Sequence, residues 1–332
     1  MKALVLTDKE RMVVKDVTKP NINPDEVLVK VKHCGICGTD VHIFHGQPGS
    51  AQSDPPLILG HEFSGEIVEV GDNVSLLKVG DRVGIDPNIY CGKCQYCQNG
   101  RFQLCEHLEA IGVTRDGGMA EFCAVPEKNC IKLGEHVTDL EGALIEPLGC
   151  VLHGANLLPP IHSDTNILII GAGFIGRLFL STLILKNPNR VDILERKAER
   201  HAALLDQGAT NAIQSVDGHE NNYDIVIECV GKKVTSEAAI RAARKGAYVL
   251  LFGVPAPDET IEVPAFDIYS KELTISGSFI NPFTMRDAMK HYDNKQIDLD
   301  VLVSDHIALE DVENILANFS NIDISKAVID IQ

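Results

Sequence analysis

The feature that most restricts the fold of this chain is a group of four cysteines within fifteen residues. They follow the spacing C-x2-C-x2-C-x7-C in a polar segment rich in Gly, Gln and Asn, as Cys91, Cys94, Cys97 and Cys105. Four thiolates this close can fold one loop around a tetrahedral zinc ion, and soft sulfur donors favour zinc, with an iron–sulfur cluster as the alternative. Because protein would fill all four positions, we expect this zinc to be structural.

A cysteine quartet also occurs in zinc ribbons that bind nucleic acid, but the charge of this chain argues against that function. Asp and Glu number 47 against 30 Lys and Arg, which gives a formal net charge of −17. An acidic surface repels phosphate backbones, so we expect no nucleic-acid partner. Ten cysteines without a signal-peptide pattern, and apolar runs of only strand length, predict a cytoplasmic protein with no membrane partner.

The 332 residues suit two domains whose textures differ. The first 150 residues contain short alternating runs, such as Val27–Val31, Phe63–Val70 and Asp81–Ile85, which predict an all-β, barrel-like part. After Pro159, strand patterns alternate with helical ones, which is typical of a doubly wound parallel sheet. The predicted strands cover 167–170, 191–194, 224–228 and 248–252, and the predicted helices cover 175–186, 198–207 and 236–244.

The regular alternation breaks down after about Leu273. Two more helices are predicted over 285–292 and 309–318. The strand-like run Ala327–Ile331 has no sheet of its own nearby, so we expect it to return to the N-terminal domain.

A second set of potential metal ligands precedes the quartet. A catalytic zinc needs about three protein ligands and one open position. Cys37 and His61 are suitable ligands, and either Glu62 or the distant Glu146 is the third. Taken singly, Cys37 is equally well explained as a buried structural cysteine, and His61 as a core histidine.

Glu146 is the acid of the largely apolar stretch Gly142–Leu152. The bland interpretation is a carboxylate at a helix start, just before Pro147, where the helix dipole favours it. The residue could serve both as a ligand and as a helix-start residue.

The sequence Gly171-Ala-Gly173-Phe174-Ile175-Gly176 follows a predicted strand and opens a helical pattern, which is the context that a dinucleotide-binding loop requires. The first glycine makes the turn, the second admits a pyrophosphate, and the third lets helix and strand pack closely. The helix N-terminus then faces the anion.

The residue that follows the next predicted strand bears on the cofactor. Glu195 lies 19 positions beyond Gly176 (195 − 176), where an acid binds the ribose hydroxyls and repels a 2′-phosphate. NAD is therefore favoured, although the adjacent Arg196 keeps NADP possible. The alternative interpretation is that Glu195 and Arg196 are solvated charges on a loop with no role in cofactor binding.

Together these motifs resemble the zinc-containing medium-chain dehydrogenase family over nearly the whole chain, and within it the polyol (sorbitol and arabinitol) branch. The shared elements are Cys37-Gly-Thr-Asp-Val-His42, Gly60-His-Glu-Phe-Ser-Gly65, Val79-Gly-Asp-Arg-Val83, the cysteine quartet, Gly117-Gly-Met-Ala-Glu-Phe122, the glycine loop and Glu146-Pro-Leu. The resemblance implies an α/β fold in which a Rossmann doubly wound parallel sheet is inserted into a GroES-like β-barrel catalytic domain. The implied parts are residues 1–152 with a structural zinc lobe at 88–108, an NAD-binding domain at 153–275, and a return segment at 276–332.

The resemblance also implies a catalytic site in the cleft between the domains. Cys37, His61 and one of the two glutamates would hold a second zinc ion per chain, and the other glutamate would bind through water or exchange during turnover. Thr39 would take the proton of the substrate hydroxyl and pass it through the ribose hydroxyls to His42. Asp40 would orient His61.

By the same resemblance, a glutamate in place of a cysteine as the third zinc ligand favours a sugar alcohol as substrate and a ketose as product. The arginine and aromatic residue that sorbitol-type enzymes carry are replaced by Ile280 and Asn281, of which Asn281 could bind one hydroxyl. The alternatives are an L-threonine 3-dehydrogenase, a butanediol dehydrogenase, a sugar-alcohol-phosphate dehydrogenase and, more remotely, a non-catalytic binding protein. By resemblance we expect a homodimer or homotetramer that assembles through the edge Leu273–Phe279.

Overall fold

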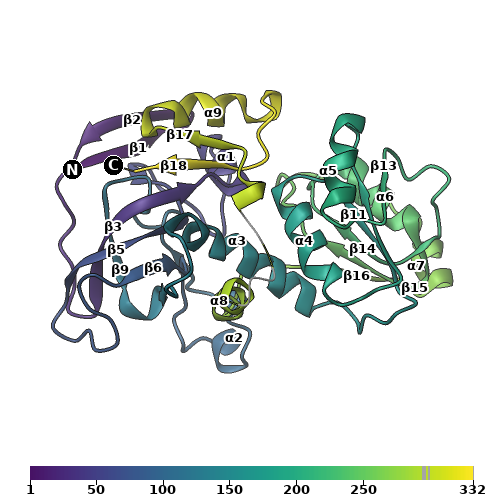
Figure 1. Cartoon of the computed structure of the whole chain (residues 1–332), viewed down its shortest axis with the longest axis horizontal. Helices are drawn as coiled ribbons and strands as arrows, with labels where there is room; N and C mark the ends of the chain where they lie inside the picture. Colours follow the sequence, from purple (N-terminus) through teal and green to yellow (C-terminus); the bar gives the residue numbers. More distant parts are fainter. Residues whose placement is uncertain (294–296, 298–299, 332) are drawn as a thin grey trace. The chain divides into compact units, whose positions relative to one another are not determined.

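The computed structural model describes residues 1–293, 297 and 300–331 and divides into two compact units (Figure 1). Unit 1 comprises Met1–Gly149 and Ile280–Gln332, and unit 2 comprises Cys150–Phe279. The boundaries expected from the sequence, after 152 and after 275, lie three and four residues away (152 − 149 and 279 − 275). The end of the return segment, Gln332, and residues 294–296 and 298–299 lie outside the described residues.

Unit 1 is built around a seven-stranded sheet of order β10-β6-β5-β3-β18-β17, in which β9 also pairs with β3. A second sheet has the order β2-β1-β4, and β7 pairs with β8. The strands are β1 (Lys2–Asp8), β2 (Arg11–Asp16), β3 (Glu26–Gly35), β4 (Leu57–Ile58), β5 (Glu62–Val70), β6 (Arg82–Ile85), β7 (Asn88–Ile89), β8 (Glu109–Ala110), β9 (Phe122–Pro126), β10 (Cys130–Lys132), β17 (Asp305–Ile307) and β18 (Ala327–Asp330).

The long strand β3 organises this unit. It pairs with β5 over almost its whole length, while β9 pairs with its first half and β18 with its last residues. The buried residues Val27, Val29 and Val31 belong to one hydrophobic core with Phe63 and Ile67 of β5. The prediction that the last strand returns to the N-terminal domain is confirmed, since β18 is antiparallel to β3.

The prediction of an all-β first part is incomplete, because unit 1 also contains helices. Most of these helices are short, and the longest, α3, carries the apolar stretch around Glu146. The helices of this part of the chain are α1 (Gly38–Phe44), α2 (Gln95–Gln98), η1 (Phe102–Leu104), η2 (Glu127–Asn129), α3 (Asp139–Asn156), α8 (Met285–Asp293), η4 (Asp300–Leu302), η5 (Leu309–Asp311), α9 (Val312–Asn318) and η6 (Phe319–Asn321).

Unit 2 is a six-stranded parallel sheet of order β13-β12-β11-β14-β15-β16, which confirms the doubly wound Rossmann fold. The strand order reverses between β11 and β14, the point at which such sheets bind ligands. The strands are β11 (Asn166–Ile170), β12 (Arg190–Leu194), β13 (Asn211–Ile213), β14 (Tyr223–Glu228), β15 (Ala243–Leu251) and β16 (Thr274–Gly277). The helices are α4 (Phe174–Ile184), η3 (Ala198–Arg200), α5 (His201–Asp206), α6 (Lys233–Ala242) and α7 (Ala265–Lys271).

The alternation of strands and helices extends slightly past Leu273, into the edge expected at Leu273–Phe279. Strand β16 follows Leu273 directly and is the sixth strand of the sheet. Its residues are only partly buried because it lies at an edge, so it lacks the continuous apolar run of an interior parallel strand. Among the described residues, no helix has the length and apolar character needed to cross a membrane.

Candidate functional site

Three strand ends meet in unit 1 because of how β3 pairs with its neighbours. The antiparallel register with β5 sets Gly35, the last residue of β3, opposite Glu62, the first residue of β5. The register with β18 sets Val328 opposite Gly35 on the other edge. Because Gly35 pairs with both strands, the residues just after β3 lie beside the residues just before β5 and just before β18.

Cys37, His61 and Glu62 are brought together at this point. Each offers one potential ligand atom, and the three atoms all lie within 4.8 Å of one another. His61 and Glu62 are buried, and Cys37 is partly exposed. Their assignment as ligands of a catalytic zinc remains a prediction, and the donor set of thiol, imidazole and carboxylate suits that ion.

Gly60 makes the turn that delivers His61. Its φ of +95° is in the left-handed region, which a side chain disfavours. A Cβ at this position would approach Cys34 Sγ to 2.6 Å and the Met119 amide nitrogen to 2.9 Å. Only glycine fits between these neighbours, so the turn at Gly60 fixes the backbone position of His61.

Asp40 holds two of these residues in place. Its Oδ2 accepts a hydrogen bond from the Cys37 backbone nitrogen at 2.9 Å, at the start of α1. Its Oδ1 lies 3.4 Å from His61 Nδ1, and both side chains are buried. This arrangement leaves His61 Nε2 for a metal, as the predicted orienting role of Asp40 requires.

The electrostatics of this cluster favour a bound cation. Burial by itself lowers the pKa of His61, but the carboxylate of Asp40 and the neighbouring Cys37 outweigh it and raise that pKa well above its ordinary value. A pocket that draws a proton onto a buried imidazole is one in which a metal ion can replace that proton.

Lys326 is a member of the cluster that the sequence did not reveal. Its ammonium forms an ion pair with Glu62 Oε2 and donates to the Ile36 carbonyl oxygen at 3.0 Å. Burial disfavours its charge, but Glu62 and Cys37 raise the pKa of Lys326, so it stays protonated. A lysine 264 residues away from its partner carries no sequence pattern that predicts this contact.

Glu146 does not belong to the group of three whose ligand atoms lie within 4.8 Å of one another. It is buried in the middle of α3, and Pro147 lies inside the helix. The interpretation as a helix-start residue is therefore wrong. The helix starts earlier, where Glu141 accepts from the Thr138 backbone nitrogen at 2.7 Å and donates its own backbone nitrogen to Thr138 Oγ1 at 3.1 Å.

Thr39 and His42 both lie on α1, three residues apart, which makes them neighbours on one face of the helix. Both are partly exposed. Burial, and to a smaller extent the nearby His45, lower the pKa of His42. His42 is therefore neutral near pH 7 and able to accept a proton, as the predicted relay requires.

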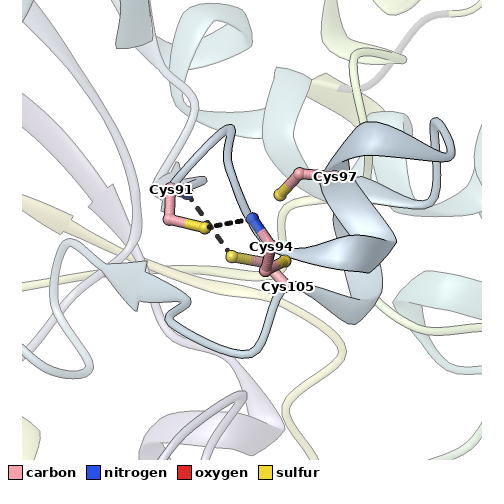
Figure 2. A group of neighbouring side chains, drawn as sticks. All are labelled: Cys91, Cys94, Cys97 and Cys105. Carbon is pink, nitrogen blue, oxygen red and sulfur yellow. Dashed lines mark hydrogen bonds between the residues drawn. The ribbon is translucent and has the colours of Figure 1, made fainter.

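The four cysteines of the quartet point toward one another, with Cys97 on the short helix α2 and the other three on the chain around it (Figure 2). Their sulfur atoms all lie within 4.8 Å of one another. The chain reinforces the loop, since the Cys94 backbone nitrogen donates to Cys91 Sγ and the Cys91 backbone nitrogen donates to Cys105 Sγ, each at 3.4 Å. This geometry fits a closed tetrahedral zinc site.

The thiols of the quartet are also tuned for a metal. Backbone amides of Cys97 and Glu106 lower the pKa of Cys94 to about 6, whereas burial raises the pKa of Cys97 to about 12. Without a cation the thiols of Cys94 and Cys97 would not ionise together. A divalent metal stabilises all four thiolates and releases their protons when it binds.

In unit 2 the glycine loop connects β11 to α4, and its three glycines are needed for different structural reasons. Gly171 has φ +99°, and a Cβ at Gly176 would collide with the Gly171 carbonyl oxygen. A Cβ at Gly173 would meet nothing within 4 Å, so this side of the turn is open. Phe174 and Ile175 then begin α4, whose N-terminal amides can bind an anion.

Glu195 directly follows β12 and is buried, while Arg196 beside it is exposed. Glu195 Oε1 accepts from the Lys197 backbone nitrogen at 2.9 Å, and Oε2 lies 3.4 Å from Arg200 Nη1. The carboxylate is thus anchored at the end of the strand, where the sequence placed a ribose-binding acid. Arg200 is a second cation there that the motif did not identify.

Asn281, the predicted substrate residue, is completely buried. Its Oδ1 accepts a hydrogen bond from Asn88 Nδ2, and its own Nδ2 has no hydrogen-bond partner among the described residues. In this structure it links β7 to the return segment, and its contact with a substrate remains a prediction.

Comparison with known protein families matches both halves of the chain. Residues 23–135 match the family described as alcohol dehydrogenase GroES-like domain, and residues 185–294 match the zinc-binding dehydrogenase family.

Known relatives extend these matches along the chain. A D-altritol 5-dehydrogenase of Agrobacterium fabrum is 34% identical over 84% of this chain and 84% of its own. An L-threonine 3-dehydrogenase of Rhizobium etli is 31% identical over 84% and 83%. A zinc-binding dehydrogenase of Sinorhizobium meliloti, solved with NADP, is 36% identical with a TM-score of 0.93 over 99% and 98%.

The chain belongs to the zinc-containing medium-chain dehydrogenase family, in the group that includes the polyol dehydrogenases. It is an enzyme, a zinc-dependent oxidoreductase of CH–OH groups that uses a nicotinamide cofactor. The remote alternative of a non-catalytic binding protein is therefore set aside.

The two cysteine-containing clusters predict different consequences of ligand loss. Cys37→Ser should remove one of two zinc ions per chain and abolish turnover, while thermal stability and cofactor binding persist. Cys94→Ser should remove the other zinc ion and lower the unfolding temperature, because the metal folds its loop. Metal content by emission spectrometry and a thermal melt check both, and a wild-type content of one zinc would contradict the two-site assignment.

Proposed function

We propose that this enzyme oxidises a secondary hydroxyl of a sugar alcohol to a ketose with NAD. The observation that carries the proposal is the ligand cluster of one cysteine, one histidine and one glutamate, a described group that contains a single sulfur donor. The similarity to an altritol dehydrogenase supports the same substrate class.

The chain's own residues divide the chemistry among them. Cys37, His61 and Glu62 would hold a zinc ion, which polarises the substrate oxygen, while the nicotinamide accepts hydride. Asp40 keeps the His61 ring in one orientation. Thr39 would take the hydroxyl proton of the substrate, and His42, neutral near pH 7, would accept it next and pass it to solvent.

The preference for NAD forms the second part of the proposal. Glu195 presents a carboxylate at the end of β12, where it would accept hydrogen bonds from ribose hydroxyls and repel a 2′-phosphate. Arg196 and Arg200 supply positive charge at the same strand end and support NADP as the alternative. We place the enzyme in the cytoplasm, because free cysteines and zinc thiolates persist under reducing conditions.

Assembly into a homodimer or homotetramer is also proposed. In the described part of the chain β16 is the last strand of its sheet, so its outer edge carries backbone groups open to pairing. The nearby Phe266 and Tyr269 of α7 are highly exposed. Light scattering after gel filtration should give a mass of two or four chains, and a proline at Ile275 should lower it. A monomeric wild type would reject this assembly.

The alternative substrate is L-threonine, since a threonine dehydrogenase is nearly as similar as the altritol enzyme. Both reactions oxidise a secondary alcohol, so the metal cluster does not separate them. A sugar-alcohol phosphate is less well supported, because Arg115, a cation that could bind a phosphate, is paired with Glu26 at 2.8 Å. A butanediol remains within the scope of the same cluster.

A substrate panel tests the proposed function. Sorbitol, xylitol, arabinitol, altritol, butanediol and threonine are supplied with NAD or with NADP, and reduced cofactor is followed by absorbance. We expect the highest kcat/KM with one of the sugar alcohols and NAD. Threonine as the preferred substrate would reject the polyol assignment, and faster turnover with NADP would reject the cofactor assignment.

The relay predicts a specific pH dependence. The pKa of His42 lies below its ordinary value, so kcat/KM should be constant near pH 7 and fall as the pH drops below that lowered value. His42→Ala should reduce kcat by about tenfold or more and remove this acid limb. His45→Ala is the matched control: it should preserve turnover but move the limb to higher pH, because a neighbouring positive charge is lost. An unchanged limb in His42→Ala would assign it to another group.

A further inference from the structure

The ion pair between Glu62 and Lys326 is the most deeply buried charged contact at the proposed zinc site. The two side chains are 2% and 4% exposed. The ammonium of Lys326 pairs with Oε2 of Glu62. One oxygen of this carboxylate is therefore paired with a cation, and Oε1 is the oxygen that could bind a metal.

The fold makes room for this pair at a specific position. A Cβ on Gly35 would collide with Glu62 Oε2 and would approach Lys326 Cε to 3.1 Å and Nζ to 3.2 Å. The lysine backbone is fixed as well, since its nitrogen donates to Ser304 Oγ at 3.1 Å and Ser304 donates its backbone nitrogen to the Lys326 carbonyl oxygen at 2.9 Å. The ammonium is thus delivered to Glu62 from a rigid strand end.

We propose that Lys326 is a positioning residue that keeps Glu62 a weak, exchangeable zinc ligand, an inference that rests on the proposed function. A carboxylate that shares its charge with an ammonium donates less strongly to a metal. The open position that the substrate needs then stays accessible. Gly35 serves the same end, because it leaves space for the carboxylate to turn toward the lysine.

The proposal predicts that zinc affinity and turnover change in opposite directions when Lys326 is replaced. When the charge of Lys326 is removed, Glu62 is left buried with zinc as its nearest cation, so it should bind the metal more firmly. Zinc affinity should rise while turnover falls. A lysine that merely supported the fold would, when replaced, lower both.

The experiment compares zinc release from the full-length enzyme by a competing chelator. The phase that belongs to the catalytic site is the one missing in Cys37→Ser. Lys326→Met should tighten that site by about tenfold, the scale on which residues behind metal ligands act, and should lower kcat. The gain should vanish in Lys326→Met/Glu62→Gln, and Lys326→Arg should restore values near wild type.

The cobalt-substituted enzyme gives a readout that is independent of turnover. In Lys326→Met the visible d–d bands should weaken, as expected when a carboxylate raises the coordination number. Gly35→Ala should weaken them too, with the lysine in place, which keeps the test valid if Lys326→Met does not fold. Lys132→Met is the matched control, because it breaks a Lys–Asp81 pair of 2.7 Å in the same unit without touching the cluster.

The outcomes separate this proposal from the proposed function. If wild type holds two zinc ions and oxidises a sugar alcohol, but Lys326→Met binds zinc no more tightly, the role of Lys326 is overturned and the function stands. If wild type lacks the catalytic zinc phase, the proposed function itself fails.

Discussion

The pairing of β3 with β5 and β18 is the constraint on which the proposed catalytic site depends. A slip of one residue between β3 and β5 would set Phe63 opposite Gly35 and turn Glu62 toward the other face. The register is fixed at a distance, by buried side chains such as Val29 and Ile67 in the shared core. Ordinary hydrophobic packing thus determines where the ligand atoms lie.

The two metal clusters depend on the fold in opposite ways. The quartet is local, and its surroundings are a small satellite cluster containing Tyr90, Tyr96 and Phe102. So few apolar contacts stabilise a loop weakly, and a bound metal supplies what the core does not. The cluster of Cys37, His61 and Glu62 instead uses strand ends that a complete sheet must bring together, so the fold precedes the site.

This difference explains what the sequence could reveal. The quartet, the glycine loop and the strands β11, β12, β14 and β15 follow from short-range spacing and are predictable. The three-residue strand β13 is too short to give such a pattern. The proline after Glu146 suggests a helix start at that position. The helix in fact begins earlier, where Thr138 and Glu141 cap it. Helix α1 is only seven residues long and was not predicted, although four candidate site residues lie on it or cap it. The contact of Lys326 with Glu62 could not be predicted from the sequence, because it depends on how β18 pairs with β3.

Each unit contains a predicted site carboxylate that lies beside a cation, and the exposure of the two side chains decides how strongly the charges interact. Glu62 and Lys326 are almost wholly buried, so water does little to screen the attraction between them, and under our proposal the lysine sets the donor strength of the glutamate. Glu195 and Arg200 lie 3.4 Å apart, with side chains that are 11% and 31% exposed. Solvent weakens that attraction, so Arg200 offsets little of the electrostatic field of Glu195. A carboxylate in that state can still accept ribose hydroxyls and oppose a phosphate, which is why the nearby arginine does not by itself reverse the expectation of NAD.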